Sequence, residues 1–315
     1  CERVFAPAMD MEARMRKAGM DLFTLETKTS VKELDFLGFT LQYELSFTNV
    51  VNMLDLGKIP ILAAERKEED PLIIAGGPCA YNPEPLADIV DVFLIGDGEE
   101  LLPQVVKMRR VGQSKEEYLK EICSLPGVYI PRFYQPEYKE DGTLLRMKRL
   151  YEGAPQQIRR ALVQDLDGTP FQTEPIVPFI ETVHDRAVVE TFRGCTRGCR
   201  FCQAGMIYRP VRERSLETIR ELARKQLDST GHEELSLLSL STSDYSRFEE
   251  LALDLMNTCK ERNVSLSLPS LRLDSFSFKV LEEIQGYKKS GLTFAPEAGS
   301  QRLRDVINKG ITEDD

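Results

Sequence analysis

The 315-residue sequence predicts an α/β protein in which an N-terminal doubly wound parallel sheet is followed by a partial (β/α) barrel. Two observations predict this class. Short apolar runs alternate with amphipathic stretches in residues 1–110, and the same alternation returns in residues 185–315. This alternation is typical of parallel sheets with helices packed against them. Residues 111–184 follow a different pattern, so we expect a connector between two domains there.

The first block, residues 1–110, contains three expected strands and three expected helices. The pattern predicts strands at 36–42, 71–78 and 90–95, and helices at 10–20, 49–59 and 100–110. Sheets of this kind bind ligands outside the carboxyl ends of their strands. The turns "GGPCAYNPEP" and "GDGEE" follow the second and third strands, so we expect a ligand site beside them.

The connector, residues 111–184, has a weaker pattern with some β character. The runs "GVYIPRFY" and "YKEDGTLLRMKRL" predict a β-hairpin around Asp141 and Gly142, because Asp-Gly is a strong hairpin turn. The proline-rich segment 167–183 is expected to be extended.

The second block, residues 185–315, contains four consecutive strand–helix units. The pattern predicts strands at 187–192, 234–240, 264–269 and 291–296, and helices at 215–231, 247–262, 276–287 and 300–310. The first of these helices has Ser215 as its expected N-cap and Gly231 beyond its end. Four such units predict a barrel-like sheet, and in barrels the chemistry lies at the C-terminal ends of the strands.

Composition and charge exclude several classes of protein. The chain is 42% hydrophobic and 29% charged, as in ordinary globular domains. No apolar run approaches the roughly 20 residues of a membrane helix, so no membrane association is expected. The net charge of −10 argues against a chain coated for nonspecific nucleic-acid binding. No signal peptide is visible and the seven cysteines cluster unevenly, which predicts a cytoplasmic protein with a metal site. Because the chain begins with Cys1 and stops after a helix-like segment, we also expect a fragment of a longer protein.

Three cysteines follow the first strand of the second block with the spacing C-x3-C-x2-C: Cys195, Cys199 and Cys202. Three thiolates are one ligand short of a closed zinc or iron–sulfur site. One interpretation is a [4Fe–4S] cluster whose fourth iron stays open for a small molecule. Another is a structural zinc site completed by Cys259, His184 or His232. A ferredoxin-type carrier would instead show C-x2-C-x2-C and a remote fourth cysteine.

The motif "CTRGCRFC" resembles the C-x3-C-x-aromatic-C signature of radical S-adenosylmethionine (SAM) enzymes. The resemblance implies that the amino and carboxylate groups of SAM chelate the open iron of the cluster. It also implies that one electron cleaves SAM to methionine and a 5′-deoxyadenosyl radical, which abstracts a hydrogen from the substrate. Phe201 matches the aromatic position that lies beside adenine in that family.

Three later loops carry the other SAM candidates that the resemblance implies. Ser241 and Thr242 in "LSLSTSDYS" would meet the SAM amino group, with an ordinary Ser/Thr turn as the alternative. Arg272 in "SLPSLRLDSF" would meet the SAM carboxylate, which suits a guanidinium, or would be a surface arginine. "FAPEAGSQRLRDVINKG" resembles a segment of cobalamin-type radical SAM enzymes and methylthiotransferases. In it, Glu297 would face the SAM ribose or the substrate as a catalytic residue. The alternative is a negative charge in the first turn of a helix, where the helix dipole stabilises it.

The segment "IIAGGPCAYNPEPLADIVDVFLIGDGEE" resembles the cobalamin-binding-like domain of many radical SAM proteins. The resemblance makes Gly76 and Gly77 candidates for cofactor binding. Asp97 replaces a more usual glutamate, and Cys79 stands where a histidine is common. The D-x-H-x-x-G motif, whose histidine ligates cobalt in some cobalamin proteins, is absent from the sequence. The resemblance still makes cobalamin a candidate cofactor. The alternative is a domain that keeps the fold and uses its cleft for substrate, or only caps the barrel.

Over essentially its whole length the chain resembles radical SAM proteins that carry a B12-binding domain and are often fused to a further C-terminal domain. The resemblance implies a truncated cobalamin-binding-like domain at 1–110 and a truncated radical SAM barrel at 185–315. It implies methylation, methylthiolation or rearrangement of a substrate, with RNA or a ribosome-linked molecule as one candidate. The implied partners are SAM and an electron donor such as flavodoxin or ferredoxin. The alternative is a zinc- or cluster-stabilised α/β protein that binds RNA or a protein without turnover.

Overall fold

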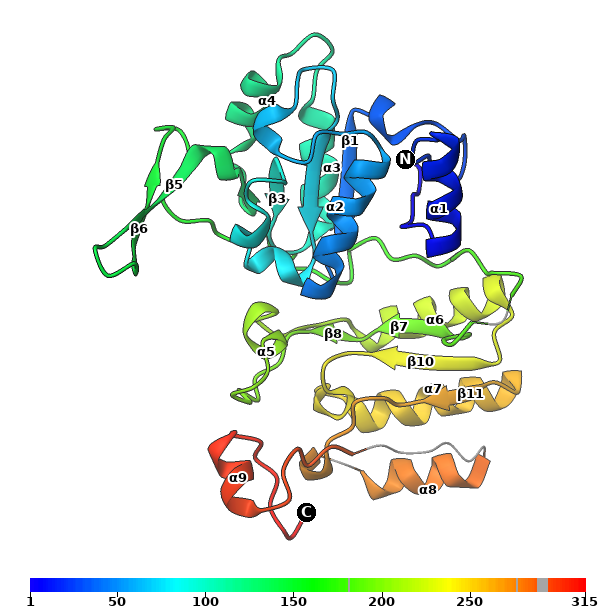
Figure 1. Cartoon of the computed structure of the whole chain (residues 1–315). Helices are drawn as coiled ribbons and strands as arrows, with labels where there is room; N and C mark the ends of the chain where they lie inside the picture. The colour runs from blue at the N-terminus through cyan, green and yellow to red at the C-terminus, as the bar shows by residue number, and fades with distance from the viewer. Residues whose placement is uncertain (181, 276, 288–293) are drawn as a thin grey trace. The chain divides into compact units, whose positions relative to one another are not determined.

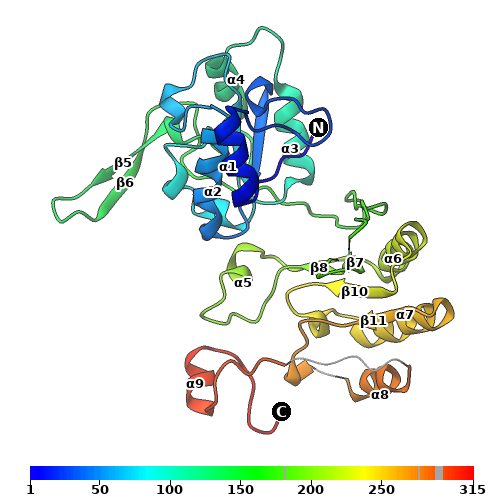
Figure 2. The ribbon, with the colours of Figure 1, turned by 45° about the vertical axis from the view of Figure 1, so that its right-hand side comes forward.

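The computed structural model describes residues 1–180, 182–275, 277–287 and 294–315, which fold into two compact units. The first unit is Cys1–Val163 and the second is Gln164–Asp315 (Figures 1 and 2). Among the described helices, none has the length and apolar character needed to cross a membrane. The domain boundaries at 110 and 184 that we expected from the sequence remain a prediction.

The first unit contains a four-stranded sheet in the order β1-β2-β3-β4. Strands β1 (Phe36–Thr40), β2 (Leu72–Gly76) and β3 (Val92–Leu94) are parallel, and β4 (Val128–Tyr129) runs antiparallel to β3. The register pairs Phe36 with Leu72 and Ile74 with Val92. The central strand β2 is apolar and buried over Leu72–Ala75, as expected of a strand that is covered on both faces.

Four helices cover the two faces of this sheet. They are α1 (Met9–Ala18), α2 (Phe47–Leu56), α3 (Gly98–Met108) and α4 (Lys115–Ile122). Side chains of α1 and α2 share one core cluster with Ile73 and Phe93, whereas side chains of α3 and α4 share another with Leu72 and Ile74. Because alternate residues of a strand point to opposite faces, the two helix pairs lie on opposite sides, and the doubly wound fold is confirmed.

The predicted hairpin is also present. Strands β5 (Tyr134–Tyr138) and β6 (Leu144–Arg149) pair antiparallel around the turn that contains Gly142, and they extend away from the four-stranded sheet (Figure 1). The expected run "GVYIPRFY" is divided, since its start forms β4 of the main sheet and its last residue begins β5. A short 3-10 turn at Pro131–Phe133 separates the two strands.

The second unit contains a parallel three-stranded sheet in the order β11-β10-β7. The strands are β7 (Ala187–Glu190), β10 (Glu234–Leu238) and β11 (Ser265–Ser267), and they pair in chain order. The helices that follow them are α6 (Leu216–Thr230), α7 (Phe248–Arg262) and α8 (Phe278–Tyr287). Helix α6 begins at the predicted cap, where Ser215 accepts a hydrogen bond from the Thr218 amide, and ends at left-handed Gly231.

This repeated strand–helix order forms the wall of the partial barrel that the sequence predicts. Half of the fourth expected strand, 291–296, lies outside the described residues, and the described half, 294–296, does not form a strand. The expected helix 300–310 is shorter than predicted, because α9 covers only Gln301–Val306. Three short elements complete the unit: β8 (Phe192–Arg193), α5 (Ala204–Ile207) and β9 (Arg212–Glu213), with β8 and β9 paired antiparallel.

The turn after β2 requires glycine for two separate reasons. Gly77 has φ 99° and ψ −178°, a conformation that is essentially confined to glycine. A Cβ added there would lie 2.8 Å from the Leu41 carbonyl oxygen. The Leu41 amide donates to the Gly76 carbonyl at 2.7 Å, and the Leu41 carbonyl accepts from the Cys79 amide at 3.1 Å. Gly77 therefore permits two strand ends to approach closely.

Comparing alanine substitutions of Gly77 and Gly142 separates the effect of crowding from the effect of backbone strain. Gly142, at the hairpin turn, also has positive φ (79°), but a Cβ there would meet nothing within 4 Å. We expect Gly142→Ala to lower the free energy of unfolding by about 1 kcal/mol and Gly77→Ala by about 3 kcal/mol or more. Urea unfolding followed by circular dichroism measures both. Equal losses in the two variants would show that the contact with Leu41 is unimportant.

Candidate functional site

The cysteine loop begins directly after β8, at the carboxyl end of the parallel sheet in the second unit. Cys195, Cys199 and Cys202 are all partly exposed free thiols. Gly194 begins the loop with φ 95°, and a Cβ there would lie 2.7 Å from the Pro210 carbonyl oxygen. The backbone amide of Arg197 donates to Cys195 Sγ at 3.5 Å. The chain thus packs closely at the start of the loop, while the three cysteines remain partly exposed.

The donor set discriminates between the two kinds of metal site. Among the described residues, no three His, Cys, Asp or Glu side chains come close enough to share one metal ion. A tetrahedral zinc site requires its ligands to converge in this way, and Cys259 is buried within α7. A cluster takes one thiolate on each of several irons, so its ligands need not converge on one point. The three accessible thiols therefore fit a cluster better than a zinc ion.

The segment after α9 holds the cysteine loop from a second side. Asn308 Nδ2 donates to the Gly198 carbonyl at 2.9 Å and to the Arg197 carbonyl at 3.4 Å. In the other direction, the Arg200 amide donates to the Ile307 carbonyl at 2.9 Å. Asn308 itself is left-handed, with φ 55°. This left-handed turn follows the end of the helix and brings the side-chain amide of Asn308 to the cysteine loop.

The loop after β10 contains two of the predicted residues, Ser241 and Thr242, and both are buried. The Thr242 amide donates to the Ser270 carbonyl at 3.1 Å, and the Thr242 hydroxyl lies 3.1 Å from that of Ser239. Ser241 Oγ is buried without a hydrogen-bond partner of acceptable geometry among the described residues, although the Asp244 carboxylate is nearby. A buried hydroxyl without a partner is uncommon, and it fits a position that binds a polar ligand.

The loop after β11 places Arg272 in a buried position rather than on the surface. Its Nε donates to Asp274 Oδ1 at 2.9 Å and its Nη2 to Asp274 Oδ2 at 3.0 Å. Nη2 also donates to the Lys309 carbonyl at 2.9 Å. The alternative of a solvated surface arginine is therefore wrong, because only 9% of this side chain is exposed.

Arg197 links the cysteine loop to the loops after β10 and β11. Its Nε donates to Asp244 Oδ2 at 2.8 Å, and its Nη1 donates to Asp274 Oδ2 at 2.9 Å. The hydrogen bonds to Asp244 raise the pKa of Arg197. Burial raises the pKa of Asp244, but the hydrogen bonds and charge of Arg197 outweigh it, so this pKa lies below its ordinary value. Both groups are therefore ionised at neutral pH.

Glu297 and Phe201 lie on either side of one lysine. Lys309 Nζ lies 3.1 Å from Glu297 Oε1 and 5.9 Å from the centre of the Phe201 ring. Phe201 is 54% exposed, so its ring is available to a ligand. Glu297 has φ 66°, and Ser270 has φ 57°. Left-handed conformations of such residues are uncommon and cluster at functional sites.

The structure thus brings together the predicted residues of the second unit that lie in the cysteine, β10 and β11 loops. Sequence reasoning missed the residues that connect them: Arg197, Asp244, Asp274, Asn308 and Lys309. Arg197 lies in the spacer between two cysteines, and the two aspartates lie in strand-end loops. Charged residues at those positions were the available signal.

Gly76 ends strand β2 of the first unit, and Gly77 begins the turn that follows it. The contact with Leu41 explains Gly77 without a ligand, whereas a Cβ on Gly76 would meet only Leu94, at an ordinary distance of 3.5 Å. Cys79 is buried, and burial raises the pKa of its thiol, so it is neutral at physiological pH. Asp97 is also buried, and its carboxylate accepts from the Val163 amide at 2.9 Å. The role predicted for the two glycines in cofactor binding remains a prediction.

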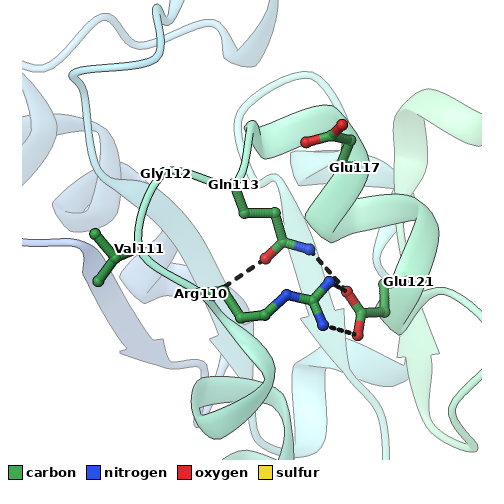
Figure 3. A pocket seen from close by; sticks show the side chains of 6 residues that line it. All are labelled: Arg110, Val111, Gly112, Gln113, Glu117 and Glu121. Carbon is green, nitrogen blue, oxygen red and sulfur yellow. Dashed lines mark hydrogen bonds and ion pairs between the residues drawn. The ribbon is translucent and has the colours of Figure 1, made fainter.

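A surface hollow of about 440 Å³ lies beside α4 in the first unit (Figure 3). Its polar side chains bind one another. Arg110 Nη2 donates to Glu121 Oε2 at 2.6 Å, and Gln113 Nε2 donates to the same oxygen at 2.7 Å (Figure 3). No predicted site residue lines this hollow, and its paired charges leave little for a ligand.

Three relatives match much of the chain. An uncharacterised protein of Methanocaldococcus jannaschii is 29% identical over 96% of the chain and 58% of its own length. An uncharacterised methyltransferase of Pyrococcus horikoshii is 24% identical over 79% of the chain and 50% of its own length. A further M. jannaschii protein, named as a methylthiotransferase, is 21% identical over 81% of the chain and 51% of its own length. The chain therefore spans about half the length of the curated relatives it matches.

Two solved structures share the fold. The cobalamin-dependent SAM radical enzyme OxsB matches with a TM-score of 0.58 and 16% identity over 90% of this chain and 38% of that one. The radical SAM methyltransferase TsrM from Kitasatospora setae matches with a TM-score of 0.58 and 11% identity over 97% and 54%. At these identities the likeness concerns the fold alone, and it agrees with the α/β architecture that the sequence predicts.

Two family models match different parts of the chain and together cover well over half of it. The model for the N-terminal region of radical SAM proteins matches residues 1–131, and the model for the radical SAM superfamily matches residues 189–315. The second match includes the cysteine loop and the three loops that follow it. The family predicted from the sequence is confirmed: this chain belongs to the radical SAM superfamily, whose cofactors are a [4Fe–4S] cluster and SAM.

Proposed function

We propose that the second unit binds a [4Fe–4S] cluster through Cys195, Cys199 and Cys202 and that it cleaves SAM reductively at the carboxyl ends of its strands. One observation carries this proposal. Three partly exposed thiols lie on one loop, and among the described residues no three His, Cys, Asp or Glu side chains converge on a single ion. When bound, the reduced cluster supplies one electron to SAM, which yields methionine and a 5′-deoxyadenosyl radical.

The residues around the cysteine loop suit the polar groups of SAM. The buried hydroxyl of Ser241 suits the amino group, and Thr242 helps to fix that loop through Ser270. The guanidinium of Arg272 suits the carboxylate, since Asp274 and the Lys309 carbonyl use its Nε and Nη2 and leave Nη1 to donate a charge-assisted hydrogen bond. Phe201 offers an exposed ring to the adenine. Glu297, beside Lys309, is the candidate for contact with the ribose or the substrate.

For the reaction class we propose transfer of a methyl or methylthio group. Support comes from the names of the relatives, one a methyltransferase and one a methylthiotransferase, and from the fold shared with TsrM. RNA as a substrate, and flavodoxin or ferredoxin as the electron donor, remain predictions from the sequence resemblance.

The competing function is a metal-stabilised binding protein that does not turn over. It requires zinc on the three cysteines, and the described residues offer no group that converges on one ion. Elemental analysis of anaerobically purified protein separates the two functions, because a cluster brings acid-labile sulfide whereas zinc brings none.

Cobalamin is a second cofactor that we propose for the strand-end face of the first unit. The fold shared with OxsB supports it. The close packing at Gly77 fits a corrinoid only in part, because Leu41 already occupies the space above this glycine. The only two histidines of the chain, His184 and His232, lie outside the first unit. Residues 1–163 therefore contain no histidine that could be a cobalt ligand.

SAM cleavage is the first test of the proposed function. Anaerobically reconstituted and reduced protein should convert SAM to methionine and 5′-deoxyadenosine, measured by liquid chromatography. Cys199→Ala removes one of three iron ligands, so we expect it to release no 5′-deoxyadenosine above the background of reduced buffer. Cys1→Ala is the matched control, because Cys1 is an exposed free cysteine outside the loop, and it should behave as wild type. A wild-type protein that holds four irons but leaves SAM intact would contradict the proposal.

The cobalt environment is the second test. The protein should retain added cob(II)alamin through gel filtration, and electron paramagnetic resonance records the spectrum of the bound cofactor. Cys79→Ala should leave this spectrum unchanged, since the neutral buried thiol is a poor ligand. Failure of cobalamin to remain with the protein through gel filtration would reject this cofactor and leave the SAM proposal intact.

A further inference from the structure

Four charged side chains join the three strand-end loops of the second unit, and we name them the charge quartet. They are Arg197 of the cysteine loop, Asp244 of the β10 loop, and Arg272 and Asp274 of the β11 loop. Two positive and two negative charges balance. Every hydrogen bond within the quartet therefore runs between an ionised donor and an ionised acceptor, the strongest kind in proteins.

The quartet is shielded from water to different degrees. The exposed fraction of the side chain is 32% for Arg197, 18% for Asp244, 16% for Asp274 and 9% for Arg272. Ion pairs on an open surface contribute little, but a largely buried charge that loses its partner is costly. The buried members should therefore hold their positions closely, and Arg197 should be the most mobile of the four.

Asp274 is the member that both arginines share. Its Oδ2 accepts from Arg197 Nη1 at 2.9 Å and from Arg272 Nη2 at 3.0 Å, while its Oδ1 accepts from Arg272 Nε. The Nε edge of Arg272 is thus fully used, and the Lys309 carbonyl holds Nη2 from another side. Among the described residues, Nη1 of Arg272 has no partner, so this end of the guanidinium is left to a ligand.

We propose that Asp274 is a positioning residue: it orients Arg272 toward the carboxylate of SAM and takes its own position from Arg197 of the cysteine loop. Order in the cysteine loop and binding of SAM are then linked through one carboxylate. This inference rests on the proposed function, because Arg272 must be the residue that meets SAM. An arginine held in place before the ligand arrives loses less freedom on binding, which is the source of the expected gain in affinity.

The opposite role is also testable, because Asp274 could compete with the SAM carboxylate for Arg272. The two roles predict opposite signs when the charge of Asp274 is removed. Loss of a positioning residue weakens SAM binding, whereas loss of a competitor strengthens it.

The first experiment measures the dissociation constant of SAM for the reconstituted protein. Asp274→Asn should weaken SAM binding roughly tenfold at unchanged iron and sulfide content, as expected for the loss of charge-assisted hydrogen bonds. The matched control is Asp254→Asn on α7, which removes an aspartate that pairs with Arg220 at 2.5 Å away from the strand-end loops. The control should bind SAM as wild type does. Unchanged or tighter binding by Asp274→Asn overturns the proposal.

A double-mutant cycle tests the link to the cysteine loop. Arg197→Lys keeps the charge but cannot span two carboxylates as the guanidinium does. It should weaken SAM binding in the wild-type background and have little further effect in the Asp274→Asn background. Equal effects in the two backgrounds would mean that Arg197 does not act through Asp274, and the link would be rejected.

Hydrogen exchange of the cluster-free protein provides a readout that needs neither cofactor nor turnover. Asp274→Asn should speed exchange of the amides of residues 195–200 as well as 270–272, because both loops lose the same partner. Asp254→Asn should speed neither. Unchanged exchange in the cysteine loop overturns the proposal, even for a variant that fails to take up iron. If wild-type protein holds the cluster but does not bind SAM, the proposed function fails, and the exchange result still reports on the link between the loops.

Discussion

Parallel pairing of β10 with both of its neighbours is the constraint on which the cofactor face depends. Strands β7, β10 and β11 run in the same direction, so their carboxyl ends lie along one edge and three separate loops begin there. The sheet itself needs only apolar side chains such as Leu235 and Leu266, both fully or almost fully buried. The loops need a different kind of interaction, since polar segments cannot be held by burial of apolar surface.

The charge quartet supplies that interaction. Charged groups at the edge of a hydrophobic core lose water on folding, and they recover this cost only when their partners are well placed. Here Asp244 accepts from Arg197, and Asp274 accepts from both Arg197 and Arg272. The Ser275 hydroxyl also donates to Asp244 at 3.2 Å. Asn308 adds a neutral contact from the far end of the unit. The cysteine loop is thus fixed by groups that come from three other segments of the chain.

Local sequence predicts what depends on periodicity and caps, and it fails where contacts between distant segments decide. The helix predicted at 215–231 is observed at Leu216–Thr230, because Ser215 and Gly231 mark its ends chemically. The helix predicted at 300–310 ends at Val306, because Asn308 turns left-handed to reach the cysteine loop. The cysteines could be predicted from their spacing. Asp244 and Asp274 could not, since an aspartate in a polar loop is ordinary until its partner is known.

The two units also show how differently a glycine-rich motif and a cysteine motif bear on function. Gly76 and Gly77 resemble residues of a cofactor site, yet the close approach of Leu41 accounts for Gly77 by packing alone. The cysteines have no such structural explanation: they are partly exposed, form no disulfide and fill no core. A residue whose chemistry the fold does not use points to a ligand more strongly than one whose shape the fold requires. By this criterion the buried hydroxyl of Ser241, which has no partner of acceptable geometry among the described residues, belongs with the cysteines, and Gly77 does not.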